Sequence, residues 1–346
     1  MVEQAGLARA EIASQCDDRD GSLGHDAKST ATEAALKVGA MRLKLGRPNL
    51  ADYAGYFDAP DARDGAPLTV TWAGVTTLLI DDGESALMTD GFFSRPSLAE
   101  VGLRSLSPSA PRIDGSLARL GVRQLAAVMP VHTHFDHAMD TAVVAERTNA
   151  QVVGGTSARL LGRGHGLPDD RLVVATPGES ITLGAYDVTL IEGAHCPPDR
   201  FPGVITTPVT PPVRASAYKC GEAWSTLVHH RPSGRRLLIV GSAGFIPGAL
   251  AEQQADVVYL GVGQLGVQPE RYLVDYWTEV VRTVGARRVV LIHWDDFFRP
   301  LHKPLRALPY AGDDLDATMR VLSRLARQDG VALHLPTLWQ RADPWD

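Results

Sequence analysis

The sequence predicts an α/β protein built as a four-layer αββα sandwich, in which two mixed β-sheets are flanked by helices. Short β-rich runs separated by tight turns come first and are typical of an antiparallel meander. Alternating strand and helix patterns follow later in the chain. A meander joined to alternating units favours two packed sheets whose outer faces are covered by helices.

The elements follow one another in a simple order. Apolar, β-branched runs bounded by Gly, Ser or Asp predict the strands, and apolar residues at helical spacing predict the helices. The predicted strands cover residues 68–72, 76–82, 85–90, 125–131, 151–156, 187–195, 256–262 and 287–294, with a hairpin over 223–245 that turns at 232–235, helices over 139–150 and 272–286, and a loop over 91–124.

Length and patterning divide the chain of 346 residues into three parts. Residues 1–30 are polar and without periodicity, which predicts a loosely ordered arm. Residues 31–67 are predicted to hold one short helix, over 31–46, and a Pro/Asp/Gly-rich linker; the helix could pack on the main domain or on a second copy of the chain. Residues 68–346 are predicted to form the main domain.

Composition argues against nucleic acid as a partner. The formal net charge is −6, no dense Lys/Arg run occurs, and aromatic residues make up only 6% of the chain. Three widely spaced cysteines, Cys16, Cys196 and Cys220, form no CxxC pair and indicate a reducing compartment. Without a signal-peptide pattern or a long apolar run, we expect a cytoplasmic protein with no membrane span.

The most informative feature is the residue at which each apolar strand stops. Strands end at His132, His195 and His293, and the first of these opens the cluster "HTHFDH" over residues 132–137. Sheets hold such residues rigidly while loops keep them accessible. Imidazole and carboxylate ligands suit zinc, with manganese or iron as competitors, and the absence of thiolates in the cluster disfavours a structural zinc site. The sequence therefore predicts a catalytic metal site.

The order of these motifs resembles the metallo-β-lactamase superfamily. The resemblance covers roughly residues 68–300 and rests on "HTHFDH", "EGAHCP", "VGSAG" and "LIHW" in that order. The opening "VTWAGVTTLLIDDGESALMTDGFFSRPS" is similar to the branch of ascorbate-6-phosphate lactonase-like and N-acyl-phosphatidylethanolamine phospholipase D-like proteins. Val75 stands where that branch usually has His, and Gly91 where it usually has Pro.

The resemblance implies a ligand set for two metal ions, zinc by preference. The ligands are His132, His134 and His195 for the first metal, and Asp136, His137 and His293 for the second. Asp90 would not bind a metal itself but would hold the ligands in position. Ser242 stands where the family usually has an Asp that bridges both metals, so it is a weak ligand at most, and the second metal is predicted to bind more weakly than the first.

The implied activity is hydrolysis of an ester-type bond (a lactone, a carboxylic ester or a phosphodiester) by a metal-bound hydroxide, with Asp136 orienting the hydroxide. Two alternatives stay open: an iron-dependent redox enzyme on the same fold, and a metal-poor binding or regulatory protein, which only Ser242 favours. The substrate is a small molecule. It has an apolar portion if Phe92, Phe93, Phe297 and Phe298 line the cleft, although core packing is the default for such residues.

Overall fold

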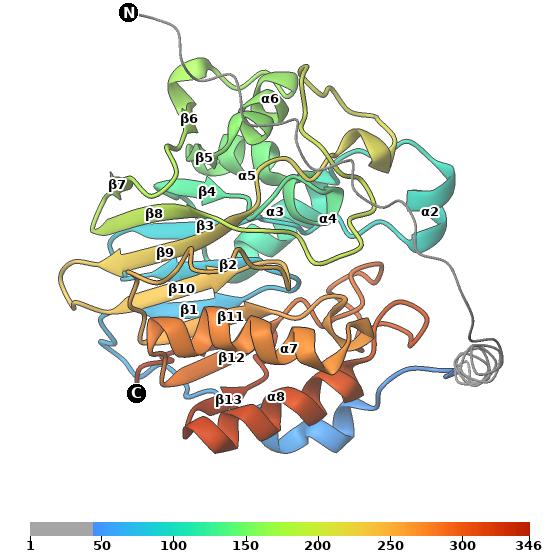
Figure 1. Ribbon diagram of the computed structural model, residues 1–346. Helices are drawn as coiled ribbons and strands as arrows, with labels where there is room; N and C mark the ends of the chain where they lie inside the picture. The colour runs from blue at the N-terminus through green and yellow to red at the C-terminus, as the bar shows by residue number, and fades with distance from the viewer. Residues whose placement is uncertain (1–43) are drawn as a thin grey trace, which may run out of the picture. The chain divides into compact units, whose positions relative to one another are not determined.

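A computed structural model describes residues 44–346 of the chain (Figure 1). Two seven-stranded mixed sheets pack face to face, and helices cover the outer side of each sheet. This arrangement confirms the predicted αββα sandwich. The arm predicted over residues 1–30, and nearly all of the helix predicted over 31–46, lie outside the described residues.

The first sheet contains the predicted meander. It is antiparallel from β14 through β1 and β2 to β3, and parallel from β3 onward. Its strands, in spatial order, are β14 (Arg341–Ala342), β1 (Thr69–Trp72), β2 (Leu78–Asp81), β3 (Ala86–Thr89), β4 (Ala127–Met129), β5 (Gln151–Gly154) and β6 (Leu172–Val174).

The second sheet contains the predicted hairpin, formed by β9 and β10. Its pairs are parallel from β10 to β13 and antiparallel from β10 to β7. Its strands, in spatial order, are β13 (Ala332–His334), β12 (Arg288–Ile292), β11 (Val257–Gly261), β10 (Arg236–Val240), β9 (Trp224–His230), β8 (Tyr186–Glu192) and β7 (Ser180–Leu183).

Helices cover the two sheets separately. Helices α5 and α6 contact β4, β5 and β6, and α3 packs on α5, whereas α7 and α8 pack together over the second sheet. The helices are α2 (Leu98–Leu103), α3 (Ala110–Leu120), α4 (Phe135–Ala138), α5 (Thr141–Thr148), α6 (Thr156–Gly164), α7 (Glu270–Trp277) and α8 (Leu315–Asp329), with a π-helical turn over Thr278–Arg282 and 3₁₀ turns over Leu50–Tyr56, Asp169–Arg171, Ala215–Ala217 and Leu265–Val267. Within residues 44–346, no helix is long and apolar enough to cross a bilayer.

The alternating direction of side chains along a strand explains why the first sheet has an apolar layer on each of its two faces. Leu78 and Ile80 of β2 belong to the large apolar cluster between the two sheets, whereas Leu79 between them belongs to the cluster beneath the helices of the first sheet. Successive side chains of a strand point to opposite faces, so a strand that is apolar throughout fits a sheet covered on both sides. Each fully buried leucine contributes roughly 1.5–3 kcal/mol to this packing.

The loop predicted over residues 91–124 was wrong, because α2 and α3 lie within it. Helix α2 is only six residues long and begins with a capping box in which Ser97 and Glu100 bond to each other's backbone N–H. Helix α3 carries Gly115 in its interior, which weakens a helical pattern, and Pro111 in its first turn, where proline is tolerated. It stays helical because Ile113 and Leu117 are buried against the first sheet's outer face.

Candidate metal centre

The predicted site residues meet at one end of the sandwich. His132 follows β4, His195 follows β8, and His293 follows β12. Strands β8, β10 and β12 run in the same direction, because β9 is antiparallel to both β8 and β10 and the β10–β12 pairs are parallel. Their carboxyl ends therefore lie at one end of the second sheet, where His195 and His293 can converge, and His132 joins them from β4 of the first sheet.

A one-turn helix divides the "HTHFDH" segment into two halves. His134 has an extended backbone and is the N-cap of α4, and its carbonyl oxygen accepts hydrogen bonds from the His137 and Ala138 N–H groups at 3.0 and 2.9 Å. His132 and His134 therefore precede the helical turn, whereas Asp136 and His137 lie on it. This local structure directs the two pairs of side chains to two neighbouring points.

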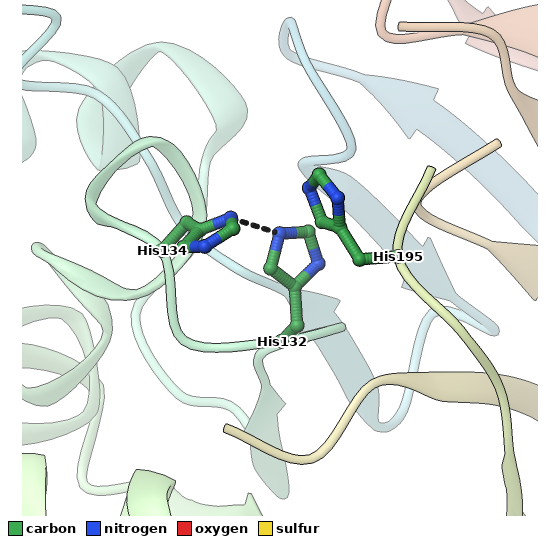
Figure 2. Close-up of side chains that lie close together, drawn as sticks. All are labelled: His132, His134 and His195. Carbon is green, nitrogen blue, oxygen red and sulfur yellow. Dashed lines mark hydrogen bonds between the residues drawn. The ribbon is translucent and has the colours of Figure 1, made fainter. Parts of the chain in front are cut away.

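The first group consists of His132, His134 and His195, whose ring nitrogens converge (Figure 2). His132 Nε2 lies 3.1 Å from His134 Nδ1. The His195 ring stands edge-on to the other two, with centroids 4.9 Å from His132 and 4.7 Å from His134. His132 and His134 are buried and His195 is half-buried, so the group is accessible from the His195 side.

The second group consists of Asp136, His137 and His293, all buried. His137 Nε2 and His293 Nε2 lie 3.2 Å apart, and each lies 3.6 Å from Asp136 Oδ2. Two atoms that bind one zinc ion at about 2.0–2.2 Å with a tetrahedral angle are about 3.3–3.6 Å apart. The three ligand atoms therefore already have the spacing that one such ion requires.

Facing ring nitrogens give a second test of the fit. His132 Nε2 faces His134 Nδ1 in the first group, and His137 Nε2 faces His293 Nε2 in the second. Neutral imidazole nitrogens that face one another at this distance can both donate their lone pairs to one cation. Three imidazoles, and two imidazoles with a carboxylate, are donor sets that zinc and iron accept. The residues present fit a metal in both groups.

Asp90 fixes the orientation of His137 from behind. His137 Nδ1 lies 2.8 Å from both Asp90 Oδ2 and the Thr76 hydroxyl, and Asp90 Oδ1 accepts the Val131 N–H at 2.9 Å. A carboxylate behind a histidine keeps the hydrogen on the ring nitrogen that faces the carboxylate and leaves the other ring nitrogen free for a metal. The supporting role of Asp90 stays a prediction, with these hydrogen bonds as its structural basis.

Burial keeps most of these imidazoles neutral. It lowers the pKa of His132 and His293, and it lowers the pKa of His195 to about 4 with help from the nearby His134. Burial also acts against the charged form of His137, but Asp90 and Asp136 outweigh it and raise its pKa. Neutral imidazoles are the form in which histidine binds metals, so the electrostatics favour ligation.

Ser242 belongs to neither group of potential ligands. It lies two residues past the end of β10, and its hydroxyl oxygen accepts the backbone N–H of Cys196 at 2.9 Å. Cys196 directly follows His195 and is fully buried. The hydroxyl therefore links the end of β10 to the segment that carries His195.

This contact gives a test of the role of Ser242. We expect Ser242→Ala to lower the free energy of unfolding by about 1–3 kcal/mol, because a buried N–H loses its acceptor. We expect the number of bound metal ions to stay unchanged. Denaturant unfolding and elemental analysis measure the two effects, with Ser225→Ala on β9 as the control. Loss of one metal equivalent in Ser242→Ala would show instead that the hydroxyl is a ligand.

Sequence reasoning missed a third set of side chains beside the first group. His134, Asp199 and Cys220 also bring their ligand atoms together, although Asp199 and Cys220 follow no predicted strand. Asp199 stands four positions after His195 in "HCPPD", and that closeness was the only signal. Thr76, which contacts both Asp90 and His137, was missed as well.

The aromatic residues divide between core and site. Phe92 and Phe93 are buried in the core, which is the default that the sequence predicted. Phe297 is half-buried, its ring lies edge-on to His293 at a centroid distance of 5.7 Å, and the Phe298 ring is 4.4 Å from it. Phe201, which was not predicted, stands 6.2 Å from the His134 ring. Each ligand group therefore has an aromatic neighbour.

The sheet order and flanking helices are those of the metallo-β-lactamase fold. No protein-family profile matches the chain, and no curated protein sequence matches it. Similar solved structures include Igni18, a metallo hydrolase from the archaeon Ignicoccus hospitalis, with 14% identity, a TM-score of 0.48, and 80% of this chain and 96% of that chain covered. YhfI from Bacillus subtilis, a metallo-β-lactamase fold protein, is 12% identical, with a TM-score of 0.43 and coverage of 80% and 97%.

A third similar structure is CmlA, a diiron β-hydroxylase from Streptomyces venezuelae. It is 12% identical, with a TM-score of 0.49, and the match covers 79% of this chain and 53% of that one. These likenesses are distant. The fold of this chain is established by its own sheet order, and its chemistry must be argued from its own side chains.

Proposed function

We propose that the protein is a metal-dependent hydrolase of the metallo-β-lactamase superfamily that cleaves an ester-type bond in a small molecule. The observation that carries this proposal is the pair of three-residue ligand groups at one edge of the sandwich, which share the His132–His137 segment. The motif order and the fold both support it. The resemblance to the lactonase-like and phospholipase D-like branch remains part of the proposal, with Val75 and Gly91 as departures from its motif.

His132, His134 and His195 would hold the first metal, and Asp136, His137 and His293 the second, with zinc as the preferred ion. Bound zinc would supply Lewis acidity and lower the pKa of a water ligand to about 7. The chain's own residues supply the rest. Asp90 orients His137, and the half-buried His195 leaves the first group open to the substrate.

Asp136 also has a part in handling the attacking water. Burial disfavours ionisation of its carboxyl group, but the imidazoles of His137 and His293 outweigh burial and lower its pKa. The carboxylate is therefore ionised at neutral pH. In that form it can accept a hydrogen bond from a water molecule and orient it toward the carbonyl or phosphoryl group of a bound substrate.

Phe201 and Phe297 support a substrate with an apolar portion. They stand beside the two ligand groups and continue into an apolar cluster that includes Val75, Phe135 and Met139. An acyl chain or lactone ring at the site would contact these rings and displace water from them. A small sugar phosphate would leave them in water, so we favour an acyl or lactone substrate.

The test is hydrolysis of a panel containing lactones, p-nitrophenyl acetate, p-nitrophenyl octanoate and a phosphodiester by metal-loaded and chelator-treated protein. We expect chelation to abolish hydrolysis and the octanoate to be preferred over the acetate. Phe297→Ala should reduce kcat/KM for the octanoate about tenfold, since burying an aromatic side chain against an apolar one is worth more than 1.4 kcal/mol.

The acetate serves as the internal control in Phe297→Ala, because its short acyl group gains little from the ring. Equal losses for both esters would contradict the apolar binding role. Hydrolysis that survives complete metal removal, or the absence of hydrolysis across the panel with iron as the bound metal, would contradict the proposed function. The second result would favour the iron-dependent redox alternative.

A further inference from the structure

A histidine in each ligand group has its second ring nitrogen turned toward a carboxylate. In the second group this is His137, whose Nδ1 lies 2.8 Å from Asp90 Oδ2. In the first group it is His134, whose Nε2 lies 3.1 Å from Asp199 Oδ1. The same histidine–carboxylate pair thus occurs twice, with the carboxylate supplied once by a strand end and once by the loop that follows His195.

The surroundings of His134 Nε2 settle which ring nitrogen carries the hydrogen. Besides Asp199, this nitrogen faces the carbonyl oxygen of Phe201 at 3.4 Å. A carbonyl and an ionised carboxylate can only accept hydrogen bonds, so the hydrogen belongs on Nε2. Nδ1 is then without a hydrogen, and it is the nitrogen that faces His132 Nε2 and the centre of the first group.

Asp199 is itself held in position. Its Oδ1 accepts the Phe201 N–H at 2.9 Å, and the Phe201 carbonyl accepts the Cys220 N–H, also at 2.9 Å. The Cys220 carbonyl in turn accepts the Thr133 N–H at 2.8 Å. This series of hydrogen bonds connects the loop that carries Asp199 to Thr133, the residue between His132 and His134.

The hydrogen-bonded segments around Cys220 and Thr133 have little room to shift. A Cβ atom built on Gly221, next to Cys220, would lie 2.5 Å from the Thr133 hydroxyl, and Gly221 has a positive φ of 66°. The side chain of Asp199 is 22% exposed, whereas that of His134 is 8% exposed. The carboxylate therefore screens His134 from solvent on one side while remaining within reach of water itself.

We propose that Asp199 is a positioning residue for the first metal: it keeps the hydrogen of His134 on Nε2 and so presents Nδ1 as the ligand atom. The inference rests on the proposed function only in requiring that the first group binds metal. It assigns to the loop over residues 196–220 a part in metal binding that no strand-end motif reveals.

Two parent variants, each with only one complete ligand group, isolate the effect of Asp199 on the first metal. His137→Ala leaves the first group as the only complete one, and His132→Ala leaves the second. In the His137→Ala background, Asp199→Ala should weaken zinc binding about 10–100-fold, the usual cost of losing a carboxylate behind a ligating histidine. In the His132→Ala background the same change should have no effect, because the second group does not contact Asp199. Competition titration with a chromogenic zinc chelator measures both affinities.

Two further variants separate positioning from general damage to the loop. Asp199→Asn keeps an oxygen acceptor without the charge and should retain more affinity than Asp199→Ala. Arg200→Ala alters the neighbouring exposed residue and should match its parent. Equal zinc affinity of Asp199→Ala and its parent, or equal losses in both backgrounds, would overturn the inference.

A readout without metal completes the test. In metal-free protein, ¹⁵N NMR of the histidine rings should show His134 with its hydrogen on Nε2, and Asp199→Ala should shift His134 toward a mixture of tautomers. An unchanged tautomer would count against the proposal. If the His137→Ala parent bound no zinc at all, the proposed function would fail, while this NMR measurement would still decide the role of Asp199.

Discussion

His137→Ala is expected to remove one of two bound metal ions and to leave the other in place. His137 Nε2 lies within 3.6 Å of both other ligand atoms of the second group, and its loss leaves only Asp136 and His293 there. The first group takes its three nitrogens from other residues. Elemental analysis after reconstitution and dialysis should therefore show about one equivalent of metal in place of about two.

Hydrolysis should fall by more than the roughly 10–100-fold that loss of a residue behind a ligand usually costs, because a ligand itself is removed. His229→Ala is the matched control, since His229 lies on β9 and belongs to neither group. The control should keep both metals and full activity. Simultaneous loss of both metals in His137→Ala would show that the division of ligands between the two groups is wrong.

Asp295→Ala should lower the free energy of unfolding by about 3–5 kcal/mol, because it removes a partner from a buried ion pair and leaves an uncompensated charge. Asp295 and Arg95 are both inaccessible to solvent and bonded to each other. Asp295 also accepts the Val75 N–H at 2.9 Å, and the Val75 carbonyl accepts the His293 N–H. The pair thus supports the backbone of a predicted ligand.

Guanidinium unfolding of wild type, Asp295→Ala and Arg95→Met/Asp295→Ala tests this account. The double variant should be less destabilised than Asp295→Ala, since no charge is left buried. Asp275→Ala removes one partner of an exposed pair with Arg271 and should have no measurable effect. A change below about 1 kcal/mol in Asp295→Ala would contradict the structural role given to the pair.

Local sequence signals were sufficient to predict much of the sandwich and the residues that converge. Apolar runs end at a histidine, as residues 287–292 do at His293, and the carboxyl ends of β8 and β12, which run the same way, lie at one end of the second sheet. His195 and His293 could therefore be expected to meet, whereas His132 belongs to the first sheet and was grouped with them by the order of the motifs. The split of the "HTHFDH" segment into two groups also follows from its spacing, because a helical turn begins directly after His134.

Contacts that depend on loop paths could not be predicted in this way. Asp199 reaches His134 because the loop over residues 196–220 folds back and bonds to Thr133, and no periodicity encodes that path. The direction of the Ser242 hydroxyl was equally hidden, since its position after β10 fits both a metal ligand and a backbone contact. Helix α2 was missed because it is only six residues long, and α3 because Gly115 lowers its helical propensity although Ile113 and Leu117 have helical spacing.

The most direct measurement of the central claim is the metal content of the full-length protein, purified without added metal and then reconstituted with zinc. The account predicts two equivalents per chain, with the second released first under mild chelation because no carboxylate bridges the two ions. Binding of less than about a tenth of an equivalent of any transition metal after reconstitution would contradict it, because both ligand groups have the donor atoms that zinc requires.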